Sequence, residues 1–199
     1  RYLTLSNNLR VLLISDPAAE KSAAALNVHV GSHQNPKERP GLAHFLEHML
    51  FLGTEKYPTA GEYQDFTSQH GGSNNAYTAE ENTNYFFDIE HASLEPALDR
   101  FAQFFIAPLF DANYVDHEKN AVNAEYLAKI NDDARREWDV YRGLFNPDHP
   151  AANFSVGNLE TLSDREGNTI RDDLAGFYQH YYSANLMTLV ILGNRKLDD

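Results

Sequence analysis

The sequence predicts an α+β domain in which a mostly antiparallel sheet is layered with helices. Segments with the alternation of strands gather at the start and in the middle of the chain, and segments with helical spacing lie in blocks between them. This order differs from the regular strand–helix repetition of a parallel sheet. The 199 residues contain no internal repeat, low-complexity stretch or linker, so we expect a single domain over 1–199.

The first elements should be strands, at residues 2–5, 9–15 and 23–30. Asn7 and Asn8 separate the first two, and because asparagine tolerates positive φ, this pair predicts a tight hairpin. In the third strand, apolar side chains alternate on one face. A polar loop over 31–39 then leads to a helix that begins near Pro40 and ends near Gly53.

The remaining elements follow from the same two periodicities, with a double glycine and a proline-containing loop as separators. We expect, in chain order, a helix at 59–70, strands at 73–78 and 83–90, helices at 94–105, 113–142 and 170–182, and a strand at 186–192.

The composition excludes several classes of function. A formal net charge of −13 argues against a phosphate-binding surface, so we expect no nucleic-acid partner. The chain has no cysteine, so any metal must be bound by His, Asp or Glu. No apolar run approaches the roughly 18 residues of a membrane-spanning helix, so we expect no membrane span. Because the chain begins at Arg1 rather than Met, we expect a processed product or a piece of a longer chain.

The first predicted helix carries the segment His44-Phe-Leu-Glu47-His48. Histidines four residues apart project from one face of a helix about one turn apart, so both can bind one metal ion. Glu47 lies on the same face and can hold a water molecule and accept its proton. The alternative is two partly exposed histidines on a surface helix, which the apolar opposite face of this helix disfavours.

A catalytic zinc site needs a third protein ligand. Glu118 and Glu125 lie seven residues apart in the predicted long helix, about two turns, so they should share a face. One of them can bind the ion while the other orients a ligand histidine. Spacing alone still favours the simpler interpretation, two solvated glutamates on a helix.

The motif is accompanied by further characteristic segments: Gly41-Leu-Ala-His-Phe-Leu-Glu-His-Met-Leu-Phe-Leu-Gly-Thr54, Gly72-Ser-Asn-Asn-Ala-Tyr77, Asn82-Thr-Asn-Tyr-Phe-Phe87, Leu98-Asp-Arg-Phe-Ala-Gln-Phe-Phe105, Asn120-Ala-Val-Asn-Ala-Glu125 and Tyr181-Tyr-Ser-Ala-Asn-Leu-Met187. Together they resemble the pitrilysin and insulysin branch of the inverzincin peptidases. The resemblance extends over essentially the whole chain, in order and with the family's spacing. It implies a metalloendopeptidase domain of the pitrilysin type.

The resemblance also implies roles for individual residues. His44, His48 and Glu125 would bind one Zn²⁺ per chain, and Glu47 would be the catalytic general base. Glu118 corresponds to a glutamate of the long helix that supports a ligand histidine without binding the ion.

A substrate track is implied as well. Asn75, Ala76 and Tyr77 correspond to the sheet edge along which the peptide substrate lies in this family. We therefore expect peptide substrates and binding through main-chain hydrogen bonds, with loose sequence preference.

Members of this branch consist of four homologous domains on a chain several times longer. The resemblance therefore implies that residues 1–199 are most of the first, zinc-bearing domain, and that the C-terminal half of the same polypeptide is its partner. We expect zinc-dependent endopeptidase activity in the full-length chain and little or none in this fragment alone. The resemblance implies a periplasmic location, with the cytoplasm as the alternative.

Two other functions are compatible with a related fold. One is a non-catalytic scaffold or a subunit of a processing complex, but such subunits usually lack the zinc residues, which are intact here. The other is a zinc lyase of related fold, which uses a cysteine that this chain does not have. The intact motif therefore favours the peptidase.

Overall fold

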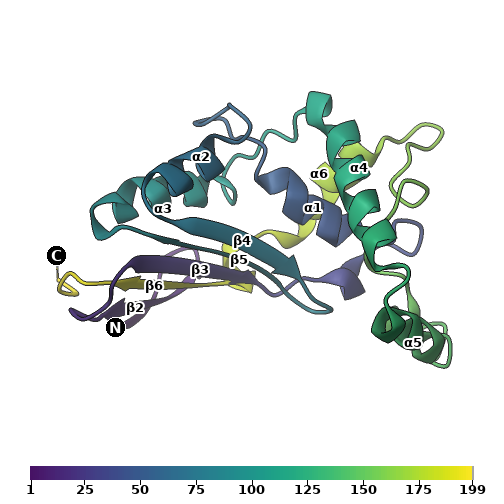
Figure 1. Cartoon of the computed structure of the whole chain (residues 1–199), viewed down its shortest axis with the longest axis horizontal. Helices are drawn as coiled ribbons and strands as arrows, with labels where there is room; N and C mark the ends of the chain where they lie inside the picture. Colours follow the sequence, from purple (N-terminus) through teal and green to yellow (C-terminus); the bar gives the residue numbers. More distant parts are fainter. Residues whose placement is uncertain (199) are drawn as a thin grey trace.

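Within residues 1–198, six strands form one mixed sheet, and the helices lie on one of its faces or beyond its end (Figure 1). The computed structural model describes residues 1–198. The strands are β1 (Tyr2–Thr4), β2 (Arg10–Ser15), β3 (Ser22–Val28), β4 (Ser73–Thr78), β5 (Thr83–Ile89) and β6 (Met187–Gly193). They lie in the order β1-β2-β6-β3-β5-β4, and every neighbouring pair is antiparallel except β2 and β6. The predicted α+β fold with a mostly antiparallel sheet is confirmed.

In the described part of the chain, six α-helices and four short 3-10 helices accompany the strands. They are α1 (Leu42–Leu50), α2 (Glu62–Gln69), α3 (Leu94–Gln103), α4 (Ala112–Lys129), α5 (Asp133–Arg142), α6 (Ile170–Tyr181), η1 (Ser32–Gln34), η2 (His91–Ser93), η3 (Pro150–Ala152) and η4 (Ala184–Leu186). Figure 1 shows α2 and α3 above one end of the sheet, with α4 and α5 at the end far from both termini. Among residues 1–198, no helix combines the length and apolar character needed to cross a bilayer.

Helix α1 is the centre of the hydrophobic core. Seven of its nine residues are buried, and Phe45, Leu46, Met49 and Leu50 have no exposed surface. They pack on the alternate buried residues of β3 and β5, which place every second side chain toward the helices. Because α1 is enclosed in this way, the motif that it carries is held on a rigid element rather than on a loop.

Two predicted helices differ clearly from those in the structure. The helix expected at 113–142 is two helices, because Asp132 accepts a hydrogen bond from the backbone N–H of Arg135 and caps the start of α5. The helix expected from residue 59 begins at Glu62, since Gly61 adopts a left-handed conformation with φ 84°. The hairpin at Asn7-Asn8 is confirmed, with φ 68° at Asn8.

The loop before α1 is not simply a polar surface loop, because Arg39 is buried with 1% of its surface exposed. Its guanidinium donates hydrogen bonds from Nε to the carboxylate of Asp173 in α6 and from Nη1 to the carbonyl oxygen of Ser163. These contacts tie the entry of α1 to two segments more than a hundred residues away. A buried ion pair of this kind fixes how the joined segments align, and removing one partner leaves the other charge uncompensated.

We predict that Arg39→Leu lowers the free energy of unfolding of this chain by about 3–5 kcal/mol, because it leaves Asp173 without its cation. Urea denaturation followed by circular dichroism measures the change. The matched control is Lys37→Ala, which removes an exposed ion pair with Asp148 and should cost at most about 1 kcal/mol. Equal effects of the two substitutions would contradict a structural role for the buried pair.

Candidate metal centre

The start of α1 is positioned by a close backbone approach. Gly41 precedes the helix with φ 90°, and a Cβ atom built on it would lie 2.3 Å from the Cα of Gly157. Gly157 also has φ 90°, so both positions need glycine. The approach brings the carbonyl group of Val156 beside the first turn of α1, and the side-chain oxygen of Asn35 accepts the N–H of Ala43 there at 2.8 Å.

In each histidine of the motif, Nδ1 lies within hydrogen-bonding distance of an acceptor oxygen. In His44, Nδ1 lies 2.7 Å from the carbonyl oxygen of Val156, and in His48 it lies 3.1 Å from Oε2 of Glu118. Carbonyl and carboxylate oxygens only accept hydrogen bonds, so both Nδ1 atoms carry the proton. In the neutral rings, the lone pair is therefore on Nε2, the atom that is free to bind a metal.

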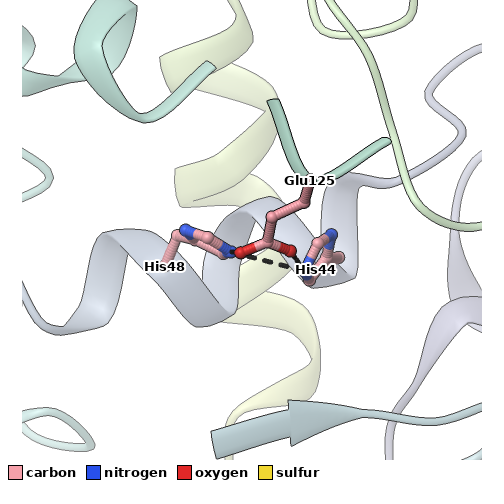
Figure 2. A group of neighbouring side chains, drawn as sticks. All are labelled: His44, His48 and Glu125. Atoms are coloured by element: carbon pink, nitrogen blue, oxygen red, sulfur yellow. Dashed lines mark hydrogen bonds and ion pairs between the residues drawn. The ribbon is translucent and has the colours of Figure 1, made fainter. Parts of the chain in front are cut away.

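The free ring nitrogens converge with the third predicted ligand. The two Nε2 atoms lie 3.3 Å apart, and Glu125 places its oxygens 3.4 Å from Nε2 of His44 and 3.6 Å from Nε2 of His48. Figure 2 shows the carboxylate of Glu125 next to the two rings, which project from the same helix. Within residues 1–198, these three side chains form a possible metal-binding group, because one ligand atom from each lies within 4.8 Å of the other two.

This arrangement fits a zinc ion. A tetrahedral ion with bonds of about 2.0–2.1 Å separates its ligand atoms by about 3.3–3.4 Å, close to the separations between the atoms of His44, His48 and Glu125. Without a cation, two lone pairs and a carboxylate would face one another at these distances and repel. Two imidazoles with one carboxylate also form a common donor set of catalytic zinc.

The charges around the cluster attract a cation. Burial lowers the pKa of His44, but the hydrogen bonds that its protonated ring donates to Glu125 and Val156, and the charge of Glu47, raise it above its ordinary value on balance. When Nε2 of His44 carries a proton, it donates to Glu125 and lowers the pKa of that carboxyl group. The cluster therefore holds its carboxylate ionised and draws positive charge toward the Nε2 atoms.

Glu118 lies behind the ligands and uses both of its oxygens. Oε2 accepts from His48, and Oε1 lies 2.8 Å from Nδ1 of His117, an exposed histidine. Burial raises the pKa of Glu118, but these two hydrogen bonds lower it on balance. An ionised Glu118 fixes the tautomer and orientation of the His48 ring.

The predicted general base is close to this cluster but makes a different contact. Glu47 has 8% of its surface exposed, and its Oε2 accepts a hydrogen bond of 2.6 Å from the hydroxyl of Thr78. Burial raises the pKa of Glu47, while the hydrogen bond from Thr78 and the neighbouring histidines lower it, and the net direction is upward. A carboxylate with a raised pKa is a better proton acceptor near neutral pH than an ordinary glutamate.

The predicted substrate track, Asn75 to Tyr77, lies in β4, which is the edge strand of the sheet. One side of β4 pairs with β5, so the backbone groups of its other side are open to an added strand. Asn75 and Tyr77 are exposed, whereas Ala76 packs against the core. Since Thr78 reaches Glu47, strand alternation places the side chain of Tyr77 on the opposite face, away from the metal ligands.

A groove of about 1040 Å³ opens beside these residues. The residues that line it include His44, Thr78, Glu125 and Trp138 of α5. Trp138 has 46% of its surface exposed and is therefore available for contact with a bound molecule.

Sequence reasoning missed two of these groups. The backbone carbonyl of Val156 has no side-chain signature, although the glycine that follows it was a usable hint of a close approach. Thr78 follows the predicted substrate track directly, and its alternation with Tyr77 would have placed it on the face of Ala76.

The chain is similar to known proteins over its whole length. The profile of the family described as insulinase (peptidase family M16) matches residues 10–148. The chain is 52% identical to insulin-degrading enzyme of Mus musculus and 48% identical to putative zinc protease mug138 of Schizosaccharomyces pombe. Each alignment covers 100% of this chain, but only 20% and 21% of the respective relative.

Among solved structures, the crystal structure of pitrilysin matches with a TM-score of 0.95 and 45% identity. The match covers 98% of this chain and 21% of that one, so this chain spans about a fifth of the length of the proteins that it matches. The predicted resemblance to this branch of peptidases is confirmed. Zinc is the metal that the family, the zinc protease relative and the donor set support, as predicted.

We predict that Glu118→Gln weakens zinc binding by about 10–100-fold, because a neutral amide holds His48 less firmly than a carboxylate does. Competition with a chromogenic chelator measures the dissociation constant. Glu137→Gln, in exposed α5, is the matched control and should leave the constant unchanged. An unchanged constant in the Glu118 variant would remove Glu118 from the support of the site.

Proposed function

Because the chain belongs to the insulinase family, peptidase family M16, we propose that it carries the metal centre of a zinc-dependent endopeptidase that degrades peptides. The observation that carries this proposal is the donor set of His44, His48 and Glu125 with the carboxylate of Glu47 beside it. Since the chain spans about 20% of its relatives, the activity is proposed for the longer polypeptide of which this domain is a part. The predicted periplasmic location stays a prediction.

The substrate would bind as an additional strand. An extended peptide can pair with the open edge of β4 over Asn75 to Tyr77, and this supplies affinity through main-chain hydrogen bonds with little dependence on sequence. The groove beside β4 leaves room for side chains of the peptide. Loose sequence preference is consistent with an enzyme that degrades peptides rather than processing one site.

The chemistry would be divided between the ion and one carboxylate. A zinc ion held by His44, His48 and Glu125 supplies Lewis acidity, which polarises a carbonyl group and makes water a stronger acid. Glu47 holds the attacking water, accepts its proton on the carboxylate and delivers that proton to the leaving amine. Burial raises the pKa of Glu47, which favours proton uptake, whereas the charge of a bound zinc ion would act in the opposite direction and favour proton release.

We predict that Glu47→Gln in the full-length enzyme keeps its zinc but lowers turnover by several orders of magnitude, because the amide accepts no proton. Zinc content is measured by atomic absorption after dialysis, and turnover with a fluorogenic peptide. Glu55→Gln, in the exposed loop after α1, is the control. Near-normal turnover in the Glu47 variant would exclude it as the base.

The isolated chain should bind zinc and show little or no peptidase activity. It contains the ligands, but it spans only 20% of its relative, and the rest of a longer polypeptide would supply other contacts to a substrate. Turnover of the same fluorogenic peptide is compared between this chain and the full-length protein at equal zinc occupancy. Turnover by this chain alone near that of the full-length protein would contradict the need for the remaining domains.

A further inference from the structure

We propose that Thr78 is a positioning residue that fixes the carboxylate of Glu47 relative to a peptide bound along β4. The proposal rests on the proposed function, since it assigns Thr78 a role in the same reaction. Together with the general base and the metal ligands, the site would then include a residue of β4, the strand along which the substrate would lie.

The contact itself is short and enclosed. The hydroxyl of Thr78 donates to Oε2 of Glu47 at 2.6 Å, and the carboxylate has 8% of its surface exposed. The terminal torsion of a glutamate is broad, so an unrestrained carboxylate samples many orientations. A hydrogen bond to a charged acceptor is among the stronger ones and selects one orientation. Within residues 1–198, Oε1 of Glu47 accepts no hydrogen bond, so this oxygen is left for water.

Thr78 is held in place by its own surroundings. It is the last residue of β4 and pairs with Thr83 across the hairpin. The carbonyl oxygen of the next residue, Ala79, accepts the N–H of Ser32 at 2.8 Å. A Cβ atom on Gly31 would lie 2.3 Å from that carbonyl oxygen, so glycine permits the approach. The hydroxyl therefore projects from a strand end that is fixed from two sides.

The same strand presents the predicted substrate edge. Thr78 directly follows Tyr77, and α1 packs against β4. A peptide paired with β4 would thus be aligned with the strand whose last side chain holds the base. The hydrogen bond from Thr78 links the base on α1 directly to the strand along which the peptide would lie. Loss of the hydroxyl should therefore reduce the rate of the chemical step and leave substrate binding intact.

The test uses the full-length protein in the zinc-loaded form. Thr78→Val removes the hydroxyl at similar volume, and we expect kcat to fall by about 10–100-fold with KM and zinc content unchanged. Thr78→Ser restores the hydroxyl and should bring kcat to within about threefold of the parent. The matched control is Thr4→Val on the exposed strand β1, which should change none of these values.

A second readout does not depend on turnover. In crystals of the metal-free Thr78→Val protein, we expect the Glu47 carboxylate in more than one orientation, and in the Thr78→Ser protein a single one. Unchanged kcat in the Val variant overturns the proposal, as does a Ser variant as slow as the Val variant, or a single parental orientation of Glu47 without the hydroxyl. If the parent protein itself cleaves no peptide, the proposed function fails as well, and this outcome is distinct from the others.

Discussion

The site depends on one constraint, which is that both ligand histidines donate their Nδ1 protons to fixed oxygens. Val156 supplies the oxygen for His44, and Glu118 supplies it for His48. Each ring is thereby turned so that Nε2 faces the same point, where the carboxylate of Glu125 also arrives. Without these two acceptors the rings would be free to rotate, and spacing along α1 would not be enough to make a binding site.

Much of the surrounding fold can be understood as support for these acceptors. The contact between Gly41 and Gly157 places the carbonyl group, and α4 brings both glutamates to α1 from one helix face. The buried ion pair of Arg39 and Asp173 fixes the loop that leads into α1. The ligands are thus held by contacts between segments that are distant in sequence, and the helix that carries the motif has little freedom to move.

Local pattern was enough to predict most elements and the two histidine ligands, whereas Glu125 is predicted as a ligand only by the resemblance to the peptidase family. Alternation in β3 and β5 and the four-residue spacing of His44 and His48 depend on near neighbours, which a single sequence contains. The break before α5 was missed because Asp132 alone caps the new helix, and no glycine or proline separates the two helices in the sequence. The burial of Arg39 and the contact between Thr78 and Glu47 could not be predicted, because each partner lies far away along the chain.

The open edge of β4 has a consequence for how the domain behaves in solution. A strand kept unpaired so that an extended peptide can join it is equally able to pair with the same edge of a second copy. Natural sheets usually protect such edges by covering them, which here would also block the groove beside the metal ligands. The net charge of −13 offers another protection, since two copies repel each other before their edges meet. The edge of β4 therefore affects both how readily two copies associate and how readily a peptide reaches the metal ligands.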